Sequence, residues 1–203
     1  MAERARPRHF SMLRGFHLAD LFTIANGFCG VAAVFQAMTF LSIGSRWHLD
    51  VAALLVPLAL VLDVLDGRIA RWRHQTSEMG RELDSLADVI SFGVAPAAIA
   101  FAAGLDRAID QLILMYFVGC GVSRLARYNI TATDLSRDLG KVTYFEGTPI
   151  PTSVVPLGLL MLAFHHGSLY PVEVLGLRLH LVTLLFLVSG SLMISKTLRI
   201  PKP

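Results

Sequence analysis

The chain has 203 residues, of which 54% are hydrophobic and 16% are charged, and its formal net charge is +3. A soluble domain is typically about 45–50% apolar and about a quarter charged. The extra apolar residues fall in blocks close to the roughly 20 residues that cross a bilayer. This composition excludes an ordinary soluble domain. Basic residues that lie between apolar blocks fit membrane orientation and anionic lipids better than they fit nucleic acid.

Taken in chain order, the first predicted element is a basic juxtamembrane arm at 1–17. It mixes arginines with Phe10, Leu13 and Phe16, so it is either an amphipathic helix in the headgroup plane or a basic disordered tail. We favour the amphipathic helix. The apolar block that follows the arm directly is the first span, so no cleavable signal peptide is expected.

Six transmembrane helices are predicted within one domain at 18–203, because lipid offers no hydrogen-bond partners to an open backbone. Their ranges are 18–43, 49–70, 86–105, 109–127, 149–166 and 179–196. The predicted fold class is therefore an all-α membrane protein. A segment rich in glycine and proline at 146–151 breaks any helix there and forms a loop that leads into the fifth span.

Basic residues are distributed unevenly between the two sides of this predicted bundle. Fifteen of the 18 Lys and Arg lie in the N-terminal arm, the second-to-third connection, the fourth-to-fifth connection and the C-terminal tail. These four segments share one side when six helices cross the membrane. Positive charge stays on the cytoplasmic side, so a multi-pass protein of the cell membrane with both termini cytoplasmic is expected.

Four aspartates lie at the cytoplasmic ends of the second and third predicted spans. Asp63 and Asp66 are three residues apart, and Asp84 and Asp88 are four apart, so each pair shares a helix face. The short connection at 72–83 makes the two helices antiparallel neighbours, and the four carboxylates then converge at one depth. Carboxylates in membrane helices are costly and usually functional.

The chemistry of this cluster favours divalent metal. Four carboxylates repel one another at low dielectric unless cations neutralise them. Oxygen ligands without nearby His or Cys favour Mg²⁺, Mn²⁺ or Ca²⁺ over zinc or copper, and such ions bridge phosphate oxygens. Gly67, Ala70 and Gly80 leave room for a ligand, and Arg71 supplies a guanidinium that matches phosphate. The alternative, ordinary salt bridges to nearby arginines, does not explain four acids at paired helical spacing.

The pattern Asp63-x2-Asp66-Gly67-x2-Ala70-Arg71-x8-Gly80-x3-Asp84-x3-Asp88 resembles the CDP-alcohol phosphotransferase signature, with all eight fixed positions filled over 26 residues. The resemblance implies transfer of a phosphatidyl-type group from a CDP-linked donor to an alcohol, with release of CMP. It further implies two Mg²⁺ or Mn²⁺ ions, a homodimer, and Asp88 as general base. The implied metal ligands are Asp63, Asp66, Asp84 and Asp88. The residues expected at CDP and diphosphate are Asn26, Asp63, Asp66, Gly67, Ala70, Arg71 and Gly80.

Three further segments resemble the phosphatidylserine synthase branch of that family. They are Thr23-x2-Asn26-x2-Cys29-Gly30, Arg124-Leu-Ala-Arg127-Tyr128-Asn129 and Phe145-x-Gly147-Thr148-Pro149-Ile-Pro151, in which Thr148 departs from the more usual leucine. Asn26 either contacts the diphosphate or hydrogen-bonds between helices. Arg124 and Arg127 either clamp a carboxylate or anchor the positive side of the protein. Candidate contacts to the acceptor or the lipid phosphate are Arg124, Arg127, Tyr128, Asn129, Thr148 and Ser153.

The sequence thus predicts a membrane enzyme of phospholipid biosynthesis that converts CDP-diacylglycerol and L-serine to phosphatidylserine and CMP. One alternative is a different acceptor, glycerol 3-phosphate or an inositol phosphate, or an archaeal ether-lipid donor. Another is an ion transporter, which would place its acids near mid-membrane rather than at helix ends. Membrane lipids are expected partners, and nucleic acid is not.

Overall fold

The computed structural model describes residues 18–73, 78–137, 144–174, 177–195 and 199–201. The predicted arm at 1–17 lies outside them. The helices are α1 (Leu18–Ile43), α2 (Arg46–Arg73), α3 (Glu78–Asp88), the π-helix η2 (Val89–Val94), α4 (Ala95–Ala102), α5 (Ala108–Arg137), the 3₁₀ turn η3 (Ile150–Ser153), α6 (Val154–His165) and α7 (Thr183–Ile194). The strands are β1 (Tyr144–Glu146), β2 (Pro171–Val174), β3 (Leu177–His180) and β4 (Arg199–Pro201).

Within the part of the chain that the structure describes, four helical segments are long and apolar enough to cross a membrane: Asp20–Ile43, Arg46–Ile69, Met79–Ala102 and Ala108–Ile130. The chain is therefore a mostly helical, multi-pass membrane protein, as predicted. The fifth and sixth predicted spans are shorter apolar helices, Ile150–His165 and Thr183–Ile194. Twelve residues of α-helix, the length of α6 and of α7, rise about 18 Å, less than the roughly 30 Å hydrocarbon core. Helix length thus supports four of the six predicted spans. The fifth and sixth predicted spans stay a hypothesis.

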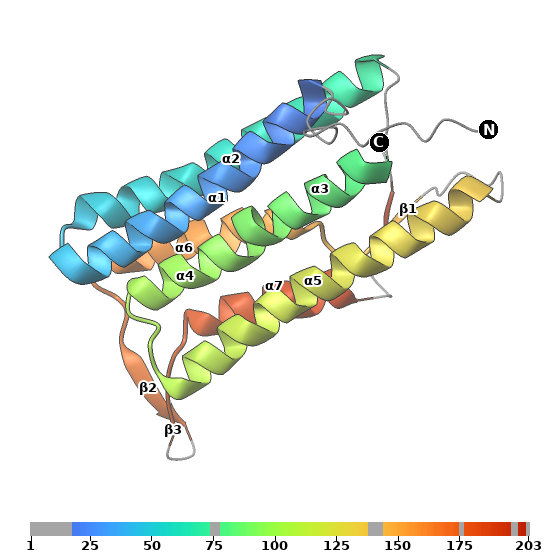
Figure 1. Ribbon diagram of the computed structural model, residues 1–203. Coiled ribbons are helices and arrows are strands. Elements are labelled where there is room, and N and C mark those ends of the chain that lie inside the picture. The colour runs from blue at the N-terminus through green and yellow to red at the C-terminus, as the bar shows by residue number, and fades with distance from the viewer. Residues whose placement is uncertain (1–17, 74–77, 138–143, 175–176, 196–198, 202–203) are drawn as a thin grey trace, which may run out of the picture.

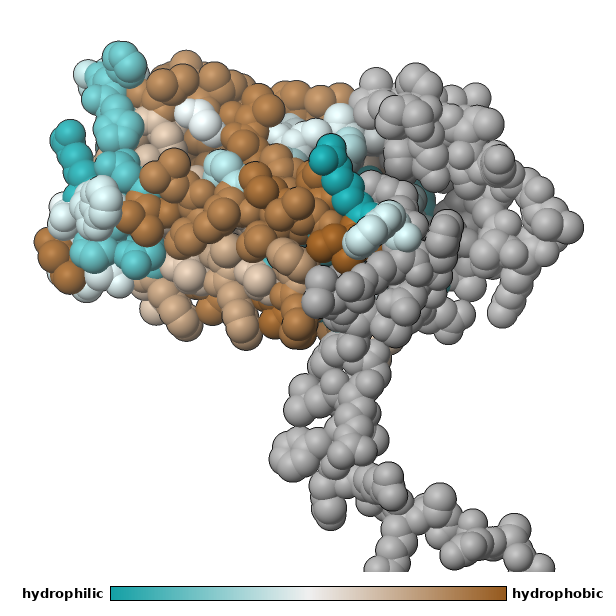
Figure 2. Space-filling model, turned by 90° about the horizontal axis from the view of Figure 1, so that it is seen from above, coloured by the Kyte–Doolittle hydropathy of each residue, from teal (hydrophilic) through white to brown (hydrophobic). Residues whose placement is uncertain are grey.

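The helices lie side by side as a bundle (Figure 1). Helices α1 and α2 form an antiparallel pair, the continuous rod α3–η2–α4 packs against α1, and α5 pairs with α7. Apolar side chains cover most of the surface seen from the α1 and α2 side, and hydrophilic ones gather at one end, on the left of Figure 2. This distribution suits a helical bundle in lipid, which requires apolar outer faces.

The core between α1 and its neighbours is built from small residues. Ala33 and Ala37 of α1 and Ala52 and Ala59 of α2 are buried. At Gly30, an added Cβ would lie only 2.6 Å from Ser91 Oγ and 2.8 Å from Ser91 Cα. Small side chains let membrane helices approach closely, because packing rather than water exclusion holds them together. Helix α1 is thereby docked tightly on η2.

The third predicted span, 86–105, begins earlier than expected and contains an irregular turn. The rod starts at Glu78, and residues 89–94 form a π-helix in which Ala95 N–H donates to Ile90 O. Pro96 follows directly and has no N–H to donate, so the wider turn accommodates it. Single π-turns inside helices are frequent at functional sites, and this one begins immediately after Asp88.

The sixth predicted span, 179–196, was wrong at its start. Residues 177–180 form β3, which pairs antiparallel with β2 and brings Pro171 opposite His180. Helix α7 begins only at Thr183. The reason is a contact across the bundle: buried Asp110 of α5 accepts from His180 N (3.0 Å) and Thr183 Oγ1 (2.6 Å) and pairs with His180 Nδ1 (2.6 Å). This Asp110 cluster ties the β2–β3 hairpin and α7 to the start of α5.

We predict that Asp110→Ala lowers the thermal unfolding midpoint of the purified protein in detergent by about 5 °C or more. Each buried donor left without an acceptor costs about 1–3 kcal/mol, and a kilocalorie shifts the midpoint by about 2–4 °C at this size. Asp106→Ala is the matched control, because Asp106 is exposed and pairs loosely with Arg107 at 3.7 Å. Equal midpoints for the two variants would contradict the role of the Asp110 cluster.

Candidate active site

The paired aspartates meet, as their spacing predicts. Asp63 and Asp66 lie near the end of α2, and Asp84 lies in α3. Asp63, Asp66 and Asp84 each contribute one carboxylate oxygen to a group in which all ligand atoms lie within 4.8 Å of one another. We call Asp63, Asp66, Asp84 and Asp88 the aspartate cluster, and the end of the bundle that holds it the aspartate end.

Asp88 lies beside this group rather than within it. It is the last residue of α3, only 6% exposed, and within electrostatic range of Asp63 and Asp84. One carboxylate oxygen, Oδ1, accepts a hydrogen bond from Asn26 Nδ2 at 3.3 Å. The structure therefore separates a trio of carboxylates that can share a cation from a fourth that is buried next to them.

The residues present fit a hard divalent cation. The trio offers only oxygen atoms, which Mg²⁺ and Mn²⁺ prefer. Asp84 Oδ1 is buried and has no hydrogen-bond partner among the described residues. A buried charged oxygen without a partner is costly, and a bound cation removes that cost. The donor set thus agrees with the divalent metal expected from the sequence.

Helix α1 lines the cluster with one polar face. Asp20, Thr23 and Asn26 are spaced three apart and are all buried. Toward the C-terminus of α1, Gly30 and Ala33 continue the same buried face. Thr23 Oγ1 donates to Asp66 Oδ2 at 2.8 Å. Asn26 contacts Asp88, and its own Oδ1 is buried without a partner among the described residues. The predicted hydrogen bond from Asn26 to another helix is therefore present. Because Asn26 Oδ1 has no partner among the described residues, this oxygen stays a candidate for a contact with the diphosphate.

The glycines of the signature and Arg71 lie on the helices that carry the aspartates. Gly67, Ala70 and Arg71 are in the last turns of α2, and Gly80 is near the start of α3. Gly67 and Gly80 are half-buried beside the aspartates. The side chains of Ala70 and Arg71 lie outside the described residues, so their expected part in CDP binding stays a prediction.

The two arginines of α5 are separated by the structure. Arg124 is half-buried, lies within electrostatic range of Asp88, and has its guanidinium carbon 5.6 Å from the Tyr128 ring centre. Arg127 is exposed. The two side chains therefore differ in burial, and the expected clamp on a carboxylate or lipid phosphate stays a prediction.

Asn129 links α5 to α3 next to the cluster. It is buried, and its Nδ2 donates to Ser85 Oγ at 3.0 Å and to Glu82 Oε2 at 3.1 Å. Ser85 directly follows Asp84. The predicted contact of Asn129 with an acceptor thus competes with bonds that hold the two helices together.

The loop before α6 is held from two sides. Strand β1 pairs antiparallel with β4, and Gly147 follows with φ +73°, a conformation that favours glycine. A Cβ at Gly147 would lie only 2.3 Å from Met193 O, and Thr148 N donates to Leu192 O at 3.2 Å. Thr148 Oγ1 and Ser153 Oγ are buried with no partner among the described residues. Both hydroxyls stay candidates for the acceptor.

Three contacts escaped the sequence analysis: the bond from Thr23 to Asp66, and the bonds of Glu82 and Ser85 to Asn129. The sequence does contain a pattern that indicates the contact of Thr23. Polar residues at 20, 23 and 26 repeat with helical spacing inside an otherwise apolar span, which indicates one polar face. Glu82 and Ser85 carry no comparable pattern.

Comparisons with known proteins agree with this geometry. The CDP-diacylglycerol–serine O-phosphatidyltransferase of Saccharomyces cerevisiae is 43% identical over 96% of this chain and 74% of its own length. The enzyme of the same name from Helicobacter pylori is 40% identical over 70% of this chain and 56% of its length. The archaetidylserine synthase of Methanothermobacter thermautotrophicus is 36% identical over 75% of this chain and 60% of its length. The chain thus spans about half to three quarters of these relatives.

The family-level match covers most of the helical bundle. The pattern of one family matches residues 16–191, a range that includes α1, the aspartate cluster, the loop before α6 and most of α7. The chain therefore belongs to the CDP-alcohol phosphatidyltransferase family.

Proposed function

We propose that the protein transfers the phosphatidyl group of CDP-diacylglycerol to L-serine and releases CMP. The observation that carries the proposal is the aspartate cluster, complete in its spacing and convergent in space, in a chain 43% identical to a relative of that name. The relatives named here all carry serine in their names. The serine acceptor therefore has independent support besides the flanking motifs.

The reaction forms a bond from the serine hydroxyl oxygen to the phosphatidyl phosphorus and breaks the bond from that phosphorus to the CMP oxygen. A divalent cation, when bound, offsets the charge on the diphosphate. Asp63, Asp66 and Asp84 would hold it, with a second ion as an extension of the same proposal. Asp88 takes the proton of the serine hydroxyl. Asn26 orients the Asp88 carboxylate through the bond to Oδ1, which leaves Oδ2 for that proton.

The serine carboxylate is assigned to Arg124. Its guanidinium is half-buried and within electrostatic range of Asp88, so a carboxylate bound there would have its hydroxyl near the base. Charge-assisted hydrogen bonds to a carboxylate are strong and directional. Thr148 and Ser153 add neutral hydroxyls from the loop before α6. Arg127, being exposed, serves as an anchor on the positive side.

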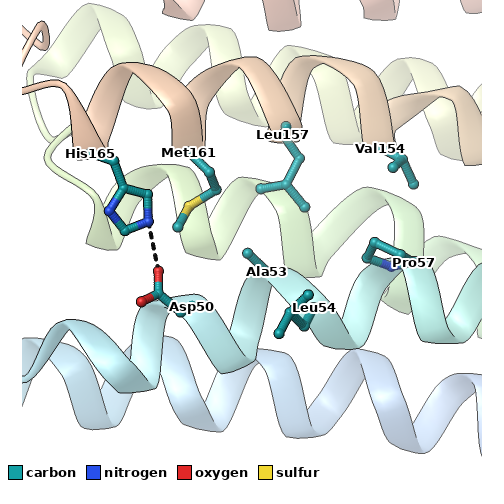
Figure 3. Close-up of a pocket in the computed structure, with 9 residues that line it drawn as sticks. Asp50, Ala53, Leu54, Pro57, Val154, Leu157, Met161 and His165 are labelled. Carbon is teal, nitrogen blue, oxygen red and sulfur yellow. Dashed lines mark hydrogen bonds and ion pairs between the residues drawn. The ribbon is translucent and has the colours of Figure 1, made fainter.

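The donor requires space for acyl chains next to the cluster. A groove of about 340 Å³ lies between α2 and α6 and is lined mainly by apolar residues, among them Leu54, Pro57, Leu157 and Met161 (Figure 3). The pair of Asp50 and His165, at 2.9 Å, lies at the end of the groove away from Pro57 (Figure 3). Pro57 lies six residues before Asp63, about 9 Å along the helix. The groove lies on a different face of α2 from Asp63 and Asp66, so in this proposal an acyl chain of a lipid whose diphosphate is at the cluster passes around α2 to enter it.

The topology follows from the same proposal. We place the aspartate end at the cytoplasmic face of the cell membrane, because the basic residues gather there. Both termini are then cytoplasmic, and α6 and α7 complete six spans with their flanking residues. A homodimer is carried over from the family resemblance.

A second donor class has a specific observation in its favour, the 36% identity to an archaetidylserine synthase. An ether-linked CDP-lipid with the same serine acceptor would use the same cluster. Parallel assays with diacyl and diether CDP-lipids distinguish the two, and assays with glycerol 3-phosphate or an inositol phosphate in place of serine test the other acceptors. Consumption of one of these phosphates without consumption of serine would refute the serine assignment.

We predict that Asp88→Asn lowers turnover by about 10²–10⁴-fold, the usual contribution of a general base, and leaves Mn²⁺-dependent binding of a CDP-lipid largely intact. The measurement is CMP release together with ligand binding by the purified protein. Asp106→Asn, a remote exposed aspartate, is the control and should keep full turnover. Near-normal turnover of Asp88→Asn would remove Asp88 from the role of base.

We predict that Arg124→Gln raises the KM for serine about 10-fold or more and changes the KM for CDP-diacylglycerol by much less, because a charge-assisted bond contributes about 1.5–3 kcal/mol. Arg127→Gln is the matched control on the same helix and should change neither constant more than about 2-fold. If both variants raise the KM for the donor instead, Arg124 binds the lipid phosphate.

We predict that Gly158→Phe lowers kcat/KM about 10-fold for a long-chain CDP-diacylglycerol and less for a short-chain one, because the ring fills the α2–α6 groove. Gly158 lines the groove, and a Cβ there meets nothing within 4 Å, so the new side chain starts in open space. Gly119→Phe, which also enters open space but on α5, is the control. Equal losses with both donors would exclude the groove as the acyl site.

A further inference from the structure

A threonine of α1 touches the aspartate cluster in a way that the reaction described above does not use. Thr23 Oγ1 donates to Asp66 Oδ2 at 2.8 Å, and both residues are buried, with 4% and 5% of their surface exposed. The two residues are 43 positions apart in the chain. The contact therefore joins two helices, α1 and α2, at a predicted metal ligand.

Thr39 on the same helix provides a comparison. Its hydroxyl donates to Phe35 O, four residues earlier, at 2.9 Å, and the residue is half-buried. That local bond is the ordinary way in which a membrane helix satisfies a threonine. Thr23 differs in that its proton is directed to a carboxylate of another helix. The bond from Thr23 thus contributes to the geometry of Asp66, whereas the bond from Thr39 contributes nothing outside α1.

The position of Thr23 is determined by the docking of α1 on η2. Ser91 Oγ donates to Asn26 O at 2.8 Å, and the close approach at Gly30 allows no sliding of the helix. Thr23 lies one turn before Asn26, on the same face. Because α1 is held at this point, Thr23 presents its hydroxyl to Asp66 at a fixed place.

We propose that Thr23 is a positioning residue for Asp66 as a metal ligand. The hydroxyl occupies one lone pair of Asp66 Oδ2 and holds the carboxylate in one rotamer, so that its remaining lone pairs face Asp63 and Asp84. Hydrogen bonds to metal-binding carboxylates typically contribute 10–100-fold in metal affinity. This inference rests on the proposed function, since it requires that the trio binds a divalent cation.

The test uses the full-length protein purified in detergent and Mn²⁺ as the probe, with free Mn²⁺ followed by electron paramagnetic resonance. We expect Thr23→Val, which keeps the shape and removes the hydroxyl, to raise the Kd for Mn²⁺ about 10-fold or more. Thr23→Ser, which restores a hydroxyl, should return the Kd to within about 3-fold of the wild type. Thr39→Val is the matched control on α1 and should leave it unchanged.

Two further measurements separate positioning from a purely structural role. The metal-free unfolding midpoint of Thr23→Val should match that of Thr39→Val, and raising Mn²⁺ should restore turnover of Thr23→Val toward the wild-type kcat. If valine prevents folding, Thr23→Ala takes its place, with the same expected rise in Kd. A loss of stability without a change in Mn²⁺ dependence would overturn the proposal.

The outcomes also distinguish this inference from the function on which it rests. Asp66→Asn should weaken Mn²⁺ binding if the trio is the metal site. Weak binding by Asp66→Asn with normal binding by Thr23→Val would reject the role of Thr23 and keep the site. Absence of Mn²⁺ binding by the wild-type protein would overturn both.

Discussion

The close contact between α1 and η2, where Gly30 meets Ser91, is the packing interaction on which the site depends. Without a side chain at position 30, α1 approaches the rod that carries Asp84 and Asp88 closely enough for Asn26 to bond Asp88. The same placement presents Thr23 to Asp66 of α2. One helix that bears no signature residue thus braces carboxylates from two others.

The four carboxylates of the aspartate cluster repel one another, and other contacts hold them together. Like charges at low dielectric repel strongly, and neutral donors such as Thr23 and Asn26 offset only part of that repulsion. A bound cation would offset the remainder, and the buried oxygen of Asp84 that lacks a protein partner among the described residues fits that proposal. At the far end of the bundle, by contrast, protein groups satisfy the Asp110 carboxylate. It accepts from Arg107 N, His180 N and Thr183 Oγ1 and pairs with His180 Nδ1, and these contacts contribute to stability.

Much of this site could be predicted from local spacing, and the errors have a common cause. The convergence of Asp63, Asp66 and Asp84 followed from helix periodicity and a short connection. Periodicity did not reveal that Arg124 is half-buried and Arg127 exposed, because spacing alone does not say where a helix face ends. The sixth span began too early because His180 and Thr183 bind an aspartate 70 or more residues away. Contacts between distant segments leave no local pattern.

By itself, the sequence determined the membrane class, the mostly helical fold, the convergence of three of the four acids and the reaction type, because hydropathy and i, i+3 spacing are local properties. Tertiary structure alone decided which polar groups contact which carboxylate: Thr23 contacts Asp66, and Asn26 contacts Asp88. It also placed Arg124 within electrostatic range of Asp88. Those choices depend on how closely helices pack, and that distance is decided jointly by small residues on several helices rather than by any one segment.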